Sequence, residues 1–222
     1  MTTAIIVAAG KSERMGAGTD KAFLSLVNKP VVAWSLLAFE RCPDIDQIVL
    51  VVRKDQLVAA KAAVKMFGIS KLHAIVSGGA KRQESVKAGL AACDLDTRYV
   101  IVHDGARPCV KSDLVSEVVK AVKRFPAVTV GKRMTDTVKR VEKGTVVAET
   151  LDRDKLWSVQ TPQGFQAKVL RAAYKALEGR DVTDDCQVVE LSGEQVKIIE
   201  SREPNFKITT VEDLQIAGAL LK

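Results

Sequence analysis

Aromatic side chains are scarce in this 222-residue chain, at 5% of the sequence. That leaves few platforms on which the bases of a nucleic acid could stack. Lysine and arginine are plentiful, with 34 residues and a net charge of +7, but they are spread along the whole chain instead of forming one basic patch. The composition therefore argues against a nucleic-acid partner and favours anionic small molecules as substrates.

Cysteines and histidines are also few, and their spacing excludes the common zinc patterns. No two cysteines have a C-x-x-C spacing, and the two histidines do not complete a ligand set. The residues concerned are Cys42, Cys93, Cys109, Cys186, His73 and His103. We expect the cysteines to be buried, reduced thiols of a cytoplasmic protein.

Long apolar runs are missing as well. No stretch reaches the ~20 apolar residues that a membrane span needs, and a strand is expected almost at the N-terminus, where a signal peptide would otherwise lie. The sequence thus predicts a soluble, cytoplasmic protein without a membrane partner.

The chain does have a regular alternation of strand and helix patterns through its first half, and its length of 222 residues indicates one domain, 1–222. Short β-branched runs predict strands, and apolar residues at helical spacing predict helices between them. The expected strands cover 4–9, 47–52, 72–76, 99–102 and 127–130, and the expected helices cover 30–41, 55–67, 82–92 and 112–124. Such alternation predicts an α/β fold, a Rossmann-like three-layer sandwich with a mostly parallel, twisted sheet.

Residues 134–153 interrupt this alternation. Two alternating segments, 135–141 and 145–150, surround Glu142-Lys143-Gly144 and predict a β-hairpin whose two faces are both polar. Because an isolated hairpin is marginal in water, we expect this protruding β-arm to pack on a second subunit. A hairpin folded back on its own domain remains the alternative.

The last third of the chain returns to the α/β pattern. Short strands are expected over 157–160 and 196–200, and helices over 166–177, 184–191 and 211–221. Ser112 and Thr183 are expected to cap the helices that follow them.

Three polar loops follow expected strands, at 10–21, 77–85 and 103–107. Because ligands of parallel sheets bind at the carboxyl ends of strands, we expect these loops to converge on one site. The first loop combines small residues with Lys11, Arg14 and Lys21, which suits a phosphate group. Its glycine spacing fits neither G-x-G-x-x-G nor a Walker loop, and a solvated basic edge is the alternative interpretation.

The residues of the first loop match the sequence motif of a known family. Ala8-Ala9-Gly10-x-x-x-Arg14-Met15-Gly16, followed by Lys21, resembles the N-terminal signature of the sugar-phosphate nucleotidyltransferases. Further motifs follow in order: Ser77-Gly78-Gly79-x-x-Arg82-x-x-Ser85-Val86, His103-Asp104-Gly105-Ala106-Arg107-Pro108, Thr135-Asp136-Thr137-x-Lys139, Leu156-Trp157-x-x-x-Thr161-Pro162-Gln163, Thr183-Asp184-Asp185 and Asn205-x-Lys207-Ile208-Thr209. With them, essentially the whole chain resembles the 2-C-methyl-D-erythritol 4-phosphate cytidylyltransferases.

The resemblance implies a reaction of the non-mevalonate isoprenoid route. A phosphate oxygen of the sugar-alcohol phosphate attacks the α-phosphorus of CTP, a CDP-alcohol forms and pyrophosphate leaves. The nucleophile is already an anion, so cations, a metal ion and positioning matter more than a strong base. His103 is therefore expected to be structural.

The resemblance also implies roles for individual residues. Arg14, Lys21 and Lys207 are the expected catalytic residues, and Asp104, just past a strand end, is the expected ligand of Mg²⁺. The expected CTP-binding residues are Ala8, Ala9, Gly10, Gly16, Gly78, Gly79, Ala80, Ser85 and Ala106. The expected residues for the acceptor are Arg107, Thr137, Arg153, Thr161 and Thr183. The arm is expected to join two chains in a homodimer, so that Arg153 reaches the neighbouring active site.

Several alternatives remain open at this point. Ribitol-5-phosphate cytidylyltransferases share the fold, although the motif Ala8-Ala9-Gly10 favours methylerythritol phosphate as the acceptor substrate. A non-catalytic nucleotide sensor is a further alternative. Thr161 is also explained as a turn residue before proline, and Thr183 as a helix cap.

Overall fold

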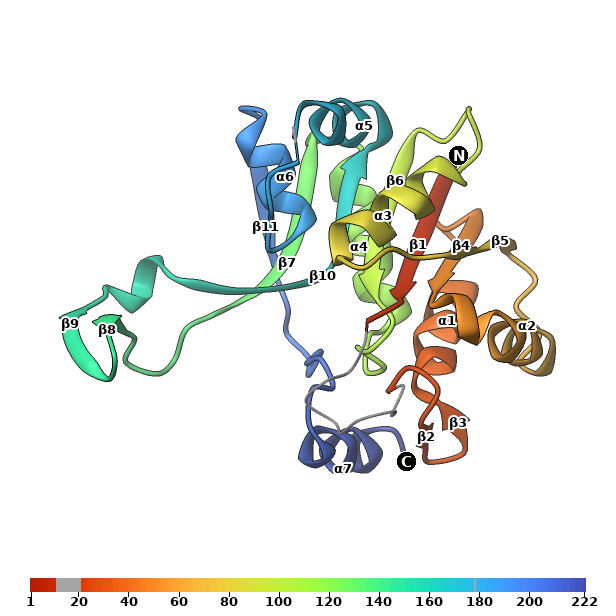
Figure 1. Cartoon of the computed structure of the whole chain (residues 1–222), viewed down its shortest axis with the longest axis horizontal. Helices are drawn as coiled ribbons and strands as arrows, with labels where there is room; N and C mark the ends of the chain where they lie inside the picture. The colour runs from red at the N-terminus through yellow and green to blue at the C-terminus, as the bar shows by residue number, and fades with distance from the viewer. Residues whose placement is uncertain (11–20, 178) are drawn as a thin grey trace.

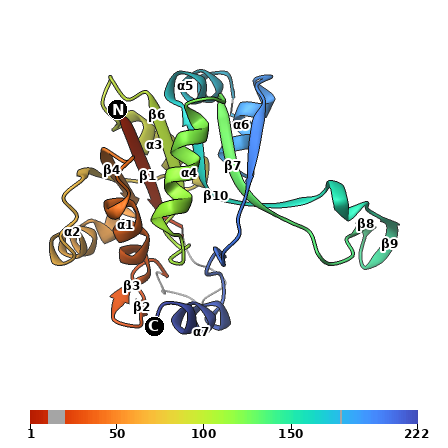
Figure 2. The same ribbon diagram turned by 180° about the vertical axis from the view of Figure 1, so that it is seen from behind.

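The computed structural model of the chain describes residues 1–10, 21–177 and 179–222. A seven-stranded sheet forms the middle layer and helices cover both of its faces, as Figures 1 and 2 show from opposite sides. This confirms the expected α/β sandwich. None of the described helices is both long and apolar enough to cross a bilayer.

Strands and helices alternate through the described chain. The strands are β1 (Thr2–Ala8), β2 (Ser25–Leu26), β3 (Lys29–Pro30), β4 (Gln47–Val52), β5 (Leu72–Ser77), β6 (Tyr99–Asp104), β7 (Ala127–Arg133), β8 (Lys139–Lys143), β9 (Val146–Thr150), β10 (Trp157–Gln166) and β11 (Val196–Glu200). The α-helices are α1 (Val31–Arg41), α2 (Leu57–Met66), α3 (Arg82–Ala91), α4 (Ser112–Val122), α5 (Ala167–Ala176), α6 (Asp185–Leu191) and α7 (Val211–Leu220). Short 3-10 turns cover Lys54–Gln56 and Arg153–Lys155.

The central sheet has the order β11-β7-β10-β6-β1-β4-β5. Its strands run parallel except for β10, which pairs antiparallel with both β6 and β7. The strand order reverses at β1, which lies between β4 and β6. That is the position at which an open α/β sheet offers a crevice to ligands.

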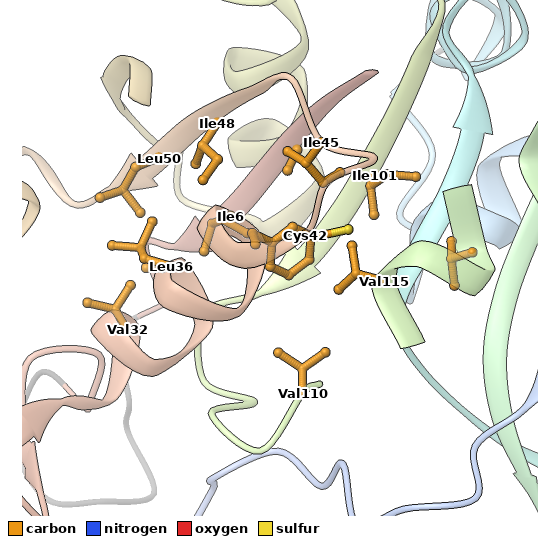
Figure 3. Packing of buried hydrophobic residues seen from close by; sticks show 14 of the residues in the cluster. Ile6, Val32, Leu36, Cys42, Ile45, Ile48, Leu50, Ile101, Val110 and Val115 are labelled. Carbon is orange, nitrogen blue, oxygen red and sulfur yellow. The ribbon is translucent and has the colours of Figure 1, made fainter. Parts of the chain in front are cut away.

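Alternate residues of β1 supply two separate cores. Ile6 packs with Leu36 of α1 and Val115 of α4 in a cluster on one face, part of which Figure 3 shows. Ile5 belongs to the cluster on the other face, together with Val86 of α3 and the buried side of α5 and α6. Because successive side chains of a strand point to opposite faces, an unbroken apolar run in β1 is what a doubly covered sheet requires.

Three local expectations are wrong. The strand expected over 157–160 continues to Gln166, so 161–165 belong to β10 and not to a loop. Ser112 is the first residue of α4 and no side chain caps that helix. Helix α6 is capped by Asp184, whose side chain accepts a hydrogen bond from the Gln187 backbone, and not by Thr183.

Helix α3 lies close to the sheet because of Gly89. A Cβ added there would come within 2.5 Å of Ile5 Cγ2 and 3.0 Å of Val51 Cγ2. We expect Gly89→Ala to lower the free energy of unfolding by about 1 to 3 kcal/mol through overpacking, measured by urea unfolding. Gly218→Ala in α7 is the matched control, since its nearest neighbour lies 3.8 Å away. That control is expected to raise stability slightly, by up to about 1 kcal/mol, and equal losses in both variants would contradict the prediction.

Strands β8 and β9 form the expected hairpin, with Gly144 at a φ of 60° in its turn. Every residue of the two strands is exposed. Figure 1 shows the hairpin at the end of two long connections that leave the body beside β7 and β10. The arm therefore protrudes, and the alternative of a hairpin folded onto its own domain is wrong.

Candidate active site

A pocket lies at the carboxyl ends of β1 and β6, where the strand order reverses. This first pocket is lined by Val7, Ala8, Ala9, Gly10, Lys21, Ala22, Gly79, Ala80, Lys81, Arg82, Ser85, Asp104, Ala106 and Lys207. All three loops expected to converge contribute residues to it. The convergence argued from the strand pattern is therefore confirmed.

Glycine is required where two walls of this pocket meet. A Cβ on Gly78 would lie 2.5 Å from Ala9 Cβ and 2.5 Å from Ser85 Oγ. Ser85 itself is buried, and its hydroxyl donates to the Lys81 carbonyl at 3.3 Å. Gly78 thus lets the chain that follows β5 approach Ala9 and Ser85, two residues that line the pocket.

Asp104 lies among three cations. Its Oδ1 accepts a hydrogen bond from Arg82 Nε at 3.1 Å, and its Oδ2 accepts one from Lys207 Nζ at 2.8 Å. Arg107 Nε approaches Oδ2 at 3.9 Å. Burial raises the pKa of Asp104, but the charges of Arg82, Lys207 and Arg107 outweigh burial and hold that pKa well below its ordinary value. Asp104 is therefore an ionised carboxylate at neutral pH.

Lys207 reaches the pocket because its segment is tied to the end of β6. The Ile208 backbone donates to the Ala106 carbonyl at 2.8 Å, and Arg107 Nη1 donates to the Asn205 carbonyl at 2.7 Å. Asn205 is buried and donates in turn to the Thr161 carbonyl at 2.8 Å. The main chain on both sides of Lys207 is thus fixed against β6 and β10.

A second pocket adjoins the first. It is lined by Arg82, Asp104, Arg107, Val159, Gln160, Thr161, Gln163, Thr183, Asp184 and Lys207. Three residues, Arg82, Asp104 and Lys207, line both pockets. The two spaces therefore meet at the carboxylate and two of its cations.

His103 and Thr161 hold the end of β6 in place. The Thr161 hydroxyl accepts a hydrogen bond from the Asp104 backbone at 3.0 Å and lies 3.1 Å from His103 Nδ1. His103 Nε2 lies 3.3 Å from the Arg107 carbonyl, which assigns the ring proton to Nε2. Both groups are engaged within the fold. His103 is structural, as expected, while the Thr161 hydroxyl is occupied by protein groups.

Burial also sets the protonation of His103. The side chain is fully buried, and loss of solvation lowers its pKa to about 3. Between that value and about 6.5 the unfolded chain binds a proton that the folded chain does not, so stability rises with pH across this window and is lost as pH falls through it. We expect the free energy of unfolding to drop by about 2 kcal/mol from pH 7 to pH 5 because of this residue.

His103→Asn tests this pH dependence by urea unfolding at both pH values. Asparagine keeps a polar atom near the position of Nδ1 and does not titrate, so the variant should lose distinctly less stability than the unsubstituted protein between pH 7 and pH 5. Equal losses in the two proteins would contradict the assignment.

The chain as a whole matches known proteins. Residues 2–222 match the family model described as 2-C-methyl-D-erythritol 4-phosphate cytidylyltransferase. The chain belongs to this family. A relative of that name from Dehalococcoides mccartyi is 46% identical over 219 residues, which cover 99% of this chain and 95% of the relative. Another, from Alkaliphilus metalliredigens, is 39% identical over 99% of this chain and 92% of its own length.

Solved structures of the same family share the fold. The 4-diphosphocytidyl-2C-methyl-D-erythritol synthase from Anaerococcus prevotii superimposes with a TM-score of 0.87 and 32% identity, covering 99% of this chain and 95% of its own. The cytidylyltransferase from Thermus thermophilus gives a TM-score of 0.80 and 31% identity over 99% and 98% of the two chains. The protein is thus a cytidylyltransferase of non-mevalonate isoprenoid synthesis, which confirms the expected family and activity.

The structure brings most of the expected cytidylyltransferase site residues together. Ala8, Ala9, Gly10, Lys21, Gly79, Ala80, Ser85, Asp104, Ala106 and Lys207 line the first pocket. Gly78 does not line it but lies directly against Ala9 and Ser85, which do. Arg107, Thr161 and Thr183 line the second pocket. Arg14 and Gly16 lie outside the described residues.

Two expected acceptor residues lie elsewhere. Thr137 and Arg153 are exposed on the connections of the arm, where Arg153 Nη1 donates to the Thr135 carbonyl at 2.7 Å. Neither residue lines the first or the second pocket. In a cytidylyltransferase monomer these two residues are therefore not part of the described site.

Sequence reasoning gave no role to Arg82 or Asp185, although both belong to quoted family motifs. Arg82 donates to Asp104 through Nε and to Asp185 Oδ2 through Nη1, the latter at 2.7 Å. The motifs Gly-Gly-x-x-Arg and Thr-Asp-Asp were the only signals. No local pattern relates two residues 103 positions apart.

Proposed function

We propose that the first pocket binds CTP and the second binds 2-C-methyl-D-erythritol 4-phosphate. The observation that supports this assignment is the set of residues that line both pockets, Arg82, Asp104 and Lys207. A transfer between two anions needs their reacting groups at a common boundary. Only there can one set of charges contact both the acceptor phosphate and the α-phosphate of CTP.

The balance of charge at this boundary suits two phosphate substrates. Arg82, Arg107 and Lys207 provide three cations that face Asp104 and Asp185, while Asp184 adds a third carboxylate to the second pocket and Lys81 a fourth cation to the first. Lys21 adds another cation to the first pocket. We assign to Lys21 and Lys207 the stabilisation of negative charge that develops on the transferred phosphoryl group. Arg14, outside the described residues, is assigned the same role on the strength of the family motif alone.

The cofactor we propose is Mg²⁺, held by Asp104. Among the described residues there is no group of three or more His, Cys, Asp or Glu side chains that could form a closed metal site. A single ionised carboxylate in a phosphate-binding pocket nevertheless fits Mg²⁺, which takes few protein ligands and fills the others with phosphate oxygens and water. When bound, the ion would neutralise charge on the phosphates of CTP.

The active unit we propose is a homodimer joined through the β-arm. Thr137 and Arg153 match acceptor-binding positions of the family but lie outside this chain's own pockets. A fully exposed hairpin whose connections carry the expected acceptor residues is explained if it reaches the pocket of a second copy. We also propose a cytoplasmic location, which the four free, buried cysteines support.

Pyrophosphate release from CTP and Mg²⁺ tests the proposed reaction. Release is expected with 2-C-methyl-D-erythritol 4-phosphate and not with ribitol 5-phosphate or without an acceptor. Release with ribitol 5-phosphate alone would contradict the proposed acceptor. Binding of CTP without any release would favour the nucleotide sensor instead. Chelation of Mg²⁺ by EDTA should abolish turnover, and activity that persists in EDTA would contradict the cofactor.

A further inference from the structure

One arginine joins the two pockets to the interior of the protein. Arg82 is the first residue of α3, and its neighbour Lys81 is fixed there because its backbone N–H donates to Glu84 Oε2 at 3.1 Å. The guanidinium then forks: Nε donates to Asp104 Oδ1 at 3.1 Å and Nη1 donates to Asp185 Oδ2 at 2.7 Å. The third nitrogen, Nη2, is buried and has no hydrogen-bond partner among the described residues. The orientation of the guanidinium therefore depends on these two carboxylates.

Asp185 is a rigidly held hydrogen-bond acceptor for the Arg82 guanidinium. Its side chain is completely buried, and its Oδ1 accepts a hydrogen bond from the Tyr174 hydroxyl at 2.5 Å. Tyr174 is itself buried on α5 and packs in the core cluster on that face of the sheet. Both oxygens of Asp185 are thus occupied, one by Tyr174 and one by Arg82. A buried carboxylate with two fixed partners is a rigid anchor.

The two carboxylate oxygens of Asp104 have different hydrogen-bond partners. Oδ1 bonds Arg82, whereas Oδ2 bonds Lys207, whose side chain is about a third exposed. Arg82 has core-anchored support, and Lys207 belongs to the segment that leads into α7. One oxygen is therefore held by an arginine anchored in the interior, and the other bonds Lys207 and lies 3.9 Å from Arg107 Nε.

We propose that Arg82, anchored by Asp185 and Tyr174, is a positioning residue that fixes the carboxylate of Asp104 through Oδ1 and leaves Oδ2 to the cations that take part in the reaction. This inference rests on the proposed role of Asp104 and extends it. A planar guanidinium can donate hydrogen bonds to two carboxylates at once in fixed directions. A lysine ammonium at the same place keeps the positive charge but not this hydrogen-bond geometry. Substitution of Arg82 by lysine therefore separates the effect of the guanidinium geometry from the effect of its charge.

Arg82→Lys tests the positioning role directly. We expect kcat to fall about 10- to 100-fold because a displaced ligand misaligns the reacting groups. The Mg²⁺ concentration for half-maximal activity should rise several-fold, while the dissociation constant of CTP, measured by calorimetry in EDTA, should stay within threefold. Asp185→Asn and Tyr174→Phe should shift kcat and the Mg²⁺ requirement in the same direction by smaller factors, in that order. The double variant of Arg82→Lys and Asp185→Asn should be about as impaired as Arg82→Lys alone, because both changes disrupt one network.

Arg171→Lys is the matched control, a partly buried arginine of α5 that lines neither described pocket. It should leave kcat, the Mg²⁺ requirement and CTP affinity unchanged. A normal kcat and Mg²⁺ requirement in Arg82→Lys would overturn the proposal. So would a lower melting temperature with an unchanged Mg²⁺ requirement, since that is the signature of a purely structural residue.

The variants of Asp185 and Tyr174 and the unsubstituted protein complete the test of the role of Arg82. If Arg82→Lys does not fold, Asp185→Asn and Tyr174→Phe take its place as the test. A higher Mg²⁺ requirement in both variants supports the proposal, and an unchanged requirement overturns it. The unsubstituted protein separates the two levels of inference. If it releases no pyrophosphate, the activity itself is contradicted and the positioning role with it, whereas full turnover in Arg82→Lys contradicts the positioning role alone.

Discussion

Replacing Asp104 by asparagine is expected to lower kcat about 100- to 1,000-fold, a loss typical of removing one charge-stabilising group. Asparagine keeps the size of the side chain but removes the negative charge that the cations Arg82, Lys207 and Arg107 surround. It also removes the one carboxylate among the described residues that lines the first pocket. Pyrophosphate release at saturating CTP and acceptor measures the loss.

The same substitution should also destabilise the fold. Three cations left around a neutral side chain repel one another in a poorly solvated place, and breaking a buried ion pair costs about 3 to 5 kcal/mol in the free energy of unfolding. Assays therefore need a temperature well below the melting temperature of the variant. A kcat that recovers fully at low temperature would show that Asp104 serves stability and not the reaction.

Asp94→Asn is the control for this prediction. Asp94 accepts a hydrogen bond from Gln47 at 2.7 Å and pairs with His73 at 3.3 Å, and it lines neither described pocket. Its substitution should leave kcat unchanged and alter stability by less than about 1 kcal/mol, as polar contacts between partly exposed side chains contribute little. A similar loss of kcat in both variants would contradict a specific role for Asp104.

The centre of the sheet was predictable from sequence because its parallel strands β1, β4 and β6 are buried on both faces. Such strands are short, continuous apolar runs, and β1, β4 and β6 all have this pattern. Strand β10 lacks it. Proline and glycine at Pro162 and Gly164 suggest a turn, but the register of β10 against β7 shifts between Gln160 and Gln163, which accommodates the proline inside a strand.

Helix caps were less predictable because neighbouring polar residues compete for one position. Thr183 and Asp184 can both cap α6 by composition, and the choice depends on which side chain reaches the free backbone N–H groups. Asp184 does so by accepting from the Gln187 backbone at 2.9 Å. Thr183 instead bonds the Gln187 side chain through its own N–H and hydroxyl.

Much of the candidate site was predictable for a different reason. Glycines and alanines at strand ends mark places where backbone approaches a ligand, and the three loops end strands of the same sheet. What could not be predicted is how the charges pair. Arg82, Asp104 and Asp185 come from three separate elements, and only the packing of α3 and α6 against the sheet brings them together.

Mixing two inactive variants should restore activity if the arm completes the site of a second copy. Arg153→Ala is expected to lower kcat about 100-fold by removing a cation from the acceptor phosphate, and Asp104→Asn inactivates the pocket. In a heterodimer of the two, one pocket has Asp104 from its own chain and Arg153 from the other chain, and the second pocket lacks both. Random pairing makes half of the dimers mixed, so about a quarter of the activity of the unsubstituted dimer should return.

The matched control is a mixture of Asp104→Asn with Lys207→Ala. Both residues line the pockets of the chain that carries them, so every pocket in that heterodimer remains defective and no activity should return. Co-expression with two different tags allows the mixed dimers to be purified, and the purified dimer of Arg153→Ala with Asp104→Asn, which has one intact pocket of two, should have about half of the activity of the unsubstituted dimer. If the mixture of Arg153→Ala and Asp104→Asn is no more active than its separate components, the arm does not supply Arg153 to a neighbour. The exposed hairpin would then need another explanation than a shared active site.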